Sequence, residues 1–235
     1  MSEALAHVSF AGIALALLFG FQLNVTVLIF VVAVAVLIGF ISQRNHLDEA
    51  NTTTIFLAVS MALAIILLRL NKSYTVDLAG YLFGNILLVT SGDIITLGII
   101  LCLNLLFLVL FLKELFYMTY NPEIAAVFKI PVTLVYYLFL IFLAVNIVVT
   151  VKITGIVLIT AQLILPGITA LNLARSIRRA IVLSVLVSVL ASFAGFLVSY
   201  FLAIPSGATI VLLLFLLFLL SLLYRNLIFR QKQPH

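Results

Sequence analysis

The chain has 235 residues, of which 66% are hydrophobic and only 8% are Asp, Glu, Lys or Arg. A soluble domain of this length cannot bury so much apolar surface, so the composition indicates a membrane protein with several spans. The net charge of +5 is then typical of basic cytoplasmic loops and gives no support to nucleic-acid binding. The single cysteine excludes an intrachain disulfide and a cysteine metal cluster.

Long apolar runs predict helical spans, because each run is close to the ~20 residues that a spanning helix needs and none alternates as a barrel strand does. In chain order the runs cover residues 4–21, 25–41, 55–70, 94–112, 132–151, 153–174, 180–202 and 209–223. Pro166 and Gly167 interrupt the sixth run, which is therefore expected to be a broken helix, and the mixed stretch 74–90 is expected to be re-entrant or interfacial. The sequence predicts an all-α polytopic membrane protein with seven or eight membrane segments in a single transmembrane domain, residues 1–235.

The basic residues predict an orientation. If the spans alternate and the tail 225–235 is cytoplasmic, nine Lys and Arg residues lie inside and three lie outside, as the positive-inside rule requires. The inner set is Arg44, Lys113, Lys129, Arg175, Arg178, Arg179, Arg225, Arg230 and Lys232. We therefore expect a multi-pass protein of the plasma or inner membrane with a cytoplasmic C-terminus.

The polar loop 113–131 contains a helix-start signal. Asn121 suits the N-cap, Pro122 the first helical position and Glu123 the positive end of the helix dipole. Ile124 and Phe128 then lie on one side. The pattern predicts a short amphipathic cytoplasmic helix, which either docks into a groove of a partner or rests on lipid headgroups.

The pair Glu3 and His7 is the first candidate site. The two residues are four apart and share one helical face. A carboxylate and an imidazole together suit a divalent transition metal such as Zn²⁺ or Mn²⁺, and two ligands bind weakly enough for transport. Alternatively, Glu3 is an exposed terminal charge and His7 an interfacial or hydrogen-bonded histidine.

Other polar residues lie within or beside the spans. Asn104, Asn146 and Gln162 are expected to form hydrogen bonds between helices. Gln162 and Pro166 are also candidates for a translocation path, since broken helices line substrate paths in transporters, although a simple proline kink explains them as well.

Two acidic residues, Asp77 and Asp93, flank the stretch 74–90 on the outer side. They would attract cations or contact a docked protein, or else they cap solvated loops. Catalytic signatures are missing from the sequence: it has no phosphate-binding glycine loop, no nucleophile–base pair and no zincin motif. An enzyme is therefore not expected, and no cofactor is implied.

Several motifs together resemble the permease subunits of bacterial ABC transporters for zinc, manganese and related metals. The start, Glu3-Ala4-Leu5-Ala6-His7, resembles an Asp-x-Leu-x-His pattern, with Glu3 where the family usually has Asp. The remaining motifs are Val76–Gly84, Asn121–Ala125, Gly155–Ile159, Leu165–Ala170 and Pro205–Val211, in the family order over nearly the whole chain. Family members usually have one further span before the first motif, so this chain is expected to lack the usual first helix.

The resemblance implies a function. It implies a homodimeric permease of a metal-importing ABC transporter, with Glu3 and His7 as transient metal ligands. Residues 121–129 would form the coupling helix for a separate ATP-binding subunit, and an extracytoplasmic metal-binding protein would deliver the ion. Two other readings stay open: a siderophore or cobalamin ABC permease, with a wider cavity, and a secondary transporter that needs no ATPase.

Overall fold

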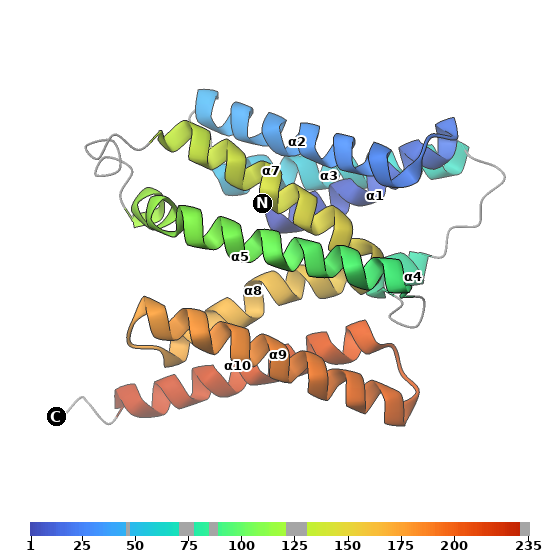
Figure 1. The fold of residues 1–235 in the computed structure, drawn as a ribbon. Coiled ribbons are helices and arrows are strands. Elements are labelled where there is room, and N and C mark those ends of the chain that lie inside the picture. Colours follow the sequence, from blue (N-terminus) through green and yellow to red (C-terminus); the bar gives the residue numbers. More distant parts are fainter. Residues whose placement is uncertain (46–47, 71–77, 85–88, 121–130, 231–235) are drawn as a thin grey trace. The chain divides into compact units, whose positions relative to one another are not determined.

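The computed structural model of the protein describes residues 1–45, 48–70, 78–84, 89–120 and 131–230 (Figure 1). These ranges contain helices and no strand. The helices are α1 (Ser2–Phe19), α2 (Leu23–Asn45), α3 (Glu49–Leu70), α4 (Leu78–Phe83), α5 (Ser91–Tyr120), α7 (Val132–Thr154), α8 (Ile156–Leu173), α9 (Ile177–Leu202) and α10 (Ser206–Arg230). In the described part, 8 helices are long and apolar enough to cross a membrane, which confirms the predicted all-α class.

The chain divides into two compact units. Unit 1 comprises Met1–Val76 and Val89–Thr150, and unit 2 comprises Asp77–Leu88 and Val151–His235. The prediction of a single transmembrane domain stays a prediction.

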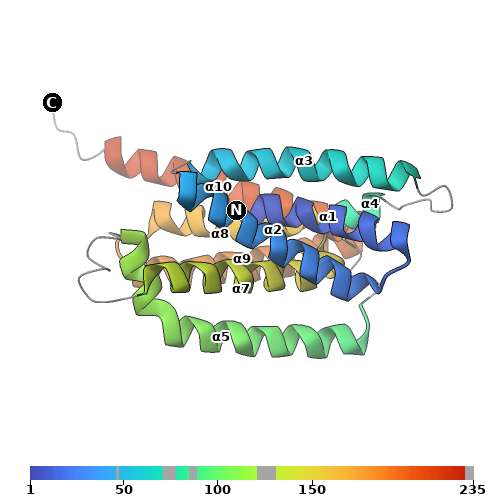
Figure 2. The same cartoon turned by 90° about the horizontal axis from the view of Figure 1, so that it is seen from above.

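Unit 1 is built around α1. About 61% of the α1 span is buried, against 33% for α2 and 17% for α3, and α1 contacts both of these helices (Figure 2). Small residues explain the close packing, because Ala4, Ala11 and Ala14 are almost fully buried and let neighbouring backbones approach. At Gly12 an added Cβ would already lie 3.3 Å from the Val27 Cα of α2.

Helices α5 and α7 of unit 1 lie side by side in both views (Figure 1, Figure 2). The rings of Phe107 and Phe142 stack with centroids 4.3 Å apart. On its other side α7 packs against α2 at Gly39, where an added Cβ would lie 2.7 Å from Leu140 Cδ1. Glycine at this position therefore permits the contact between α2 and α7.

Unit 2 is a bundle of α8, α9 and α10 with α4 at one end. Its core consists of Leu158 from α8, Ala191 from α9, and Ile210 and Leu214 from α10. Gly195 of α9 admits Ile210, since an added Cβ would lie 2.6 Å from the Ile210 Cγ1. The short helix α4 contacts both α8 and α10.

The interruption predicted at Pro166 and Gly167 is wrong. Helix α8 continues through Pro166 to Leu173, and the chain instead leaves the helical conformation at Gly155, between α7 and α8. A proline removes one backbone hydrogen bond, but membrane helices tolerate this loss where neighbouring helices supply other partners. Pro166 is buried inside the bundle, in keeping with that rule.

Large apolar side chains are exposed along most helices. Val109 of α5 is 76% exposed, and Phe193 and Phe201 of α9 are 64% and 78% exposed. In water such surfaces would aggregate, whereas lipid tails solvate them. The exposed apolar surface thus agrees with the membrane class that composition predicts.

Candidate functional site

The first turns of α1 carry the Glu3–His7 pair. The helix begins at Ser2, and the Leu5 N–H donates to the Met1 carbonyl at 3.1 Å, so both side chains belong to regular helix one turn apart. Glu3 is exposed and His7 is half-buried. The structure therefore places the two predicted donors on one helical face, with the carboxylate on the more open side.

His7 has a buried nitrogen without a hydrogen-bond partner. Its Nδ1 atom is enclosed and forms no hydrogen bond with any residue that the structure describes. A buried polar atom of this kind carries a free-energy penalty of ~1–3 kcal/mol and needs an explanation. An imidazole nitrogen is also among the commonest protein ligands for transition metals.

The pair does not form a complete metal cage. No group of three or more His, Cys, Asp and Glu side chains comes together within the part of the chain that the structure describes. A structural zinc site has four ligands and a catalytic one has three protein ligands. Two side-chain donors agree better with transient passage than with a resident metal.

Gln162 lies in α8 and bonds across to α9. Its Nε2 donates to the Ser188 hydroxyl and, at 3.0 Å, to the Ser192 hydroxyl. Its Oε1 is buried and has no hydrogen-bond partner among the described residues. Pro166, one turn later, lacks the N–H that would otherwise bond to the Gln162 carbonyl. The side-chain Oε1 and the backbone carbonyl oxygen of Gln162 could thus both face water or an ion.

The other predicted interhelical amides also have partners. Asn104 of α5 donates to the Asn146 Oδ1 of α7 at 2.6 Å, and the Asn146 Nδ2 donates to the Phe142 carbonyl at 2.8 Å. The first bond joins α5 to α7 inside unit 1 and confirms the prediction that these two amides bond between helices, whereas the second stays within α7.

Asp93 caps a helix. Its Oδ2 accepts from the Thr90 backbone N–H at 3.0 Å and from the Thr90 hydroxyl at 2.7 Å, while the Asp93 N–H donates back to the Thr90 Oγ1 at 3.3 Å. This reciprocal pattern is a capping box at the start of α5. The loop-cap reading therefore holds for Asp93. Asp77 lies outside the described residues.

The predicted coupling residues Asn121, Pro122, Glu123, Ile124 and Phe128 also lie outside the described residues. Their role stays a prediction.

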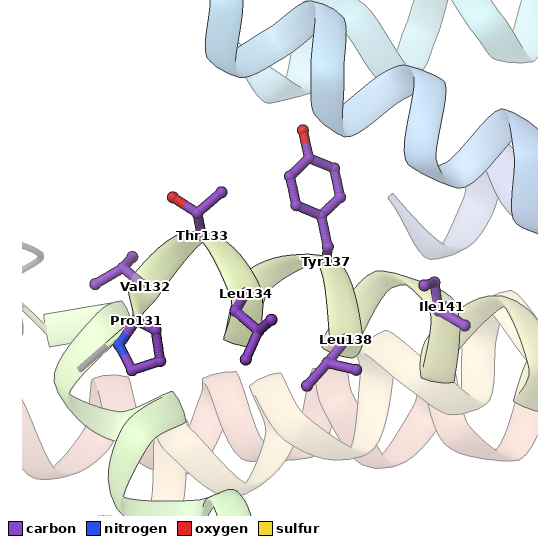
Figure 3. Close-up of a pocket in the computed structure, with 7 residues that line it drawn as sticks. All are labelled: Pro131, Val132, Thr133, Leu134, Tyr137, Leu138 and Ile141. Carbon is purple, nitrogen blue, oxygen red and sulfur yellow. The ribbon is translucent and has the colours of Figure 1, made fainter.

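Two apolar hollows lie on unit 1. One is an open surface hollow of about 660 Å³ that follows the start of α7 from Pro131 to Ile141, with Tyr137 projecting toward α2 (Figure 3). The neighbouring hollow, about 570 Å³, adds Leu37 and Phe40 of α2. Neither is lined by a carboxylate or an imidazole, so neither suits a metal ion.

Two polar contacts escaped the sequence reasoning. Ser188 and Ser192, the partners of Gln162, belong to a row of small residues on α9 that also contains Ser184, Gly195 and Ser199. Small residues spaced three or four apart mark a helix-packing face in membranes. This row is therefore the sequence signal that could have predicted the contact between Gln162 and α9.

The second missed contact joins α8 and α10. The Arg225 Nη1 donates to the Asn172 Oδ1 at 2.8 Å, and the Asn172 Nδ2 donates to the Ser221 Oγ at 3.1 Å. No sequence pattern points to partners that are 49 and 53 residues apart.

Comparison with known proteins decides the family. The sequence profile of the ABC 3 transport family matches residues 1–225. The chain belongs to the ABC 3 transport family. The match begins at the first residue and so includes the Glu3–His7 segment.

Relatives of this ABC 3 chain have names that refer to metals. The manganese transport system membrane protein MntC of Halalkalibacterium halodurans is 33% identical over 225 residues, covering 95% of this chain and 77% of that protein. The high-affinity zinc uptake system membrane protein ZnuB of Buchnera aphidicola is 31% identical over 222 residues, covering 93% of this chain and 84% of that protein.

A solved structure also resembles this ABC 3 chain. PsaBC from Streptococcus pneumoniae in complex with Fab superposes with a TM-score of 0.79 at 30% identity, covering 94% of this chain and 79% of that chain. Family, sequence relatives and fold thus agree on a multi-pass transporter component.

Proposed function

We propose that the chain is the permease subunit of an ABC importer for a divalent transition-metal ion, zinc or manganese, in the plasma or inner membrane. The chain itself is not an enzyme; a separate ATP-binding subunit hydrolyses ATP. The metal names of MntC and ZnuB support the cargo. The observation that carries the proposal is the enclosed, unpartnered Nδ1 of His7, one helical turn from the Glu3 carboxylate.

The physical argument concerns where α1 lies. It is the most buried of the candidate spans, and the half-buried His7 therefore lies against protein within unit 1, while Glu3 stays open at the start of the helix. A neutral imidazole and a carboxylate offer one nitrogen and one oxygen ligand, which zinc and manganese both accept. Water, or groups outside the described residues, would complete the coordination during passage.

Membership of the family supports a set of partners. A homodimer would form the pathway, the 121–129 segment would couple to the ATP-binding subunit, and an extracytoplasmic metal-binding protein would deliver the ion. Gln162 and Pro166 are proposed to line a later part of the path, since the Gln162 Oε1 lacks a partner. The net surplus of basic residues supports a cytoplasmic C-terminus.

The test is metal uptake by cells that express the chain with its ATP-binding subunit and binding protein. His7→Ala and Glu3→Gln should each reduce zinc or manganese uptake at least tenfold while the ATP-binding subunit still co-purifies. Ser9→Ala is the matched control on α1, because the Ser9 hydroxyl bonds only within its own helix, to the Leu5 carbonyl at 3.0 Å. Unchanged uptake in both variants, with no ATP-binding subunit co-purifying, would refute the proposal.

A further inference from the structure

Four arginines gather at one end of unit 2. Arg175, Arg178 and Arg179 lie where α8 ends and α9 begins, and Arg225 lies in the last turns of α10. We refer to these four residues as the basic end. The bond from Arg225 to Asn172, near the end of α8, brings all three helices together there. From this arrangement we propose that the basic end binds the headgroup of an anionic membrane phospholipid.

Charge is the first argument. Residues 151–235 contain seven Lys and Arg residues and no Asp or Glu. All four arginines of the basic end are exposed, and no ion pair involves them within the described ranges. The N-terminus of α9, capped by the Ser176 hydroxyl, adds its positive dipole at the same place. Such uncompensated positive charge attracts anionic headgroups.

Arg225 supplies a fixed donor. Its guanidinium donates one hydrogen bond to Asn172, which is itself fixed by the Ser221 hydroxyl, and the Ser221 hydroxyl donates to the Phe218 carbonyl at 2.7 Å. A guanidinium has five N–H donors in a planar fork that matches a phosphate. The chain of bonds therefore orients one fork and leaves donors for phosphate oxygens.

The neighbouring apolar surface identifies the occupant as a lipid. Exposed aliphatic side chains flank the arginines on every helix: Leu171 is 66% exposed, Ile177 53%, Val182 56% and Leu227 65%. A phospholipid complements both surfaces at once, since its phosphate matches the arginines and its acyl chains match the aliphatic side chains. A soluble protein partner would leave these aliphatic side chains in water or require a far larger interface.

The test uses the full chain purified in a neutral detergent, with native mass spectrometry to count retained lipids. Phosphatidylglycerol is compared with phosphatidylcholine of identical acyl chains. The variant Arg178→Gln/Arg179→Gln should weaken phosphatidylglycerol binding about thirtyfold, since each basic residue near a headgroup contributes roughly fivefold. Lys152→Gln is the matched control, because Lys152 belongs to the same unit but lies in the last turn of α7, before α8 begins. This variant should stay within about twofold of wild type.

Three outcomes would overturn the proposal. Wild type could retain both lipids equally, a result that decides the question even if the double variant does not fold. Inorganic phosphate alone could displace the bound lipid headgroup completely, which would make the basic end a site for a free anion. Finally, the double variant could keep its lipid and lose co-purification of the ATP-binding subunit in detergent, which would make the basic end a protein-docking surface.

Discussion

The substitution Gly155→Ala tests the packing of unit 2. Gly155 separates α7 from α8 and has φ of 78°, in the left-handed region that residues with a Cβ rarely adopt. An added Cβ would lie 2.6 Å from the Leu82 carbonyl oxygen and closer still to the Gly84 nitrogen. Both atoms belong to the backbone at the end of α4, so no side-chain rotation relieves the clash.

The magnitude follows from two terms. A left-handed alanine costs about 1–2 kcal/mol, and overpacking against backbone costs about 1–3 kcal/mol. The sum of about 2–5 kcal/mol lowers the unfolding temperature of a chain of this size by roughly 4–20 °C. We therefore expect Gly155→Ala to separate α4 from the start of α8 and to reduce stability strongly.

The matched control is Gly167→Ala. Gly167 lies in the interior of α8, has an ordinary φ and would have no atom within 4 Å of its new Cβ. Alanine is favoured over glycine in a helix by about 0.5–1 kcal/mol, so this variant should be as stable as wild type or slightly more stable. The assay is the fraction of detergent-solubilised fluorescent fusion protein that stays monodisperse after heating. Equal stability of the two variants would refute the close crossing of α4 and α8.

Three further predictions follow from the polar contacts and the charge pattern. Asn146→Leu removes the bond to Asn104 and should lower stability by about 1–2 kcal/mol in the same heating assay, while an unchanged melting curve would show that the pair is not formed in the membrane. Gln162→Leu should reduce metal uptake more than tenfold with a stability loss of at most ~2 kcal/mol; normal uptake would remove Gln162 from the path. A C-terminal green fluorescent protein should fluoresce and a C-terminal alkaline phosphatase should be inactive, and the reverse pair of results would invert the topology.

Hydropathy predicted the spans but not the helix ends. The apolar run 55–70 marks the third span, yet α3 begins at Glu49, where the Asp48 Oδ1 accepts from the Ala50 N–H at 3.1 Å. Likewise, α5 extends from Ser91 to Tyr120 around the apolar run 94–112. Hydropathy reports the part of a helix that is in lipid, whereas capping and local hydrogen bonds decide where the helix stops.

The rule for proline failed for a related reason. In water an interior proline breaks a helix. In lipid, backbone groups outside a helix would have no hydrogen-bond partner, so the residues on both sides of the proline strongly favour the helical conformation. The break at Gly155 has a different origin, because the backbone there passes close to the end of α4. Such a crossing depends on Gly84 and Gly155, which are 71 positions apart, and local patterns do not record contacts over that separation.

The polar side chains within the membrane-spanning helices differ in one respect: helix packing alone explains the presence of some of them but not of others. Asn104 donates to Asn146, and Asn172 is paired on both sides of its amide, by Arg225 and Ser221. Removing these amides should change stability, because each contributes a hydrogen bond that the bundle uses. Helix packing is a sufficient explanation for all of them.

His7 differs because packing leaves its Nδ1 enclosed and unpaired on the most buried span. Histidine is a poor choice for filling a core, since an apolar side chain of similar size would avoid the penalty of an unmet hydrogen bond. A ligand on the nitrogen would compensate this penalty, and a divalent cation beside the Glu3 carboxylate is such a ligand. On this argument His7 should be tolerant of apolar substitution for folding and intolerant of it for transport, the opposite of the behaviour expected for Asn146.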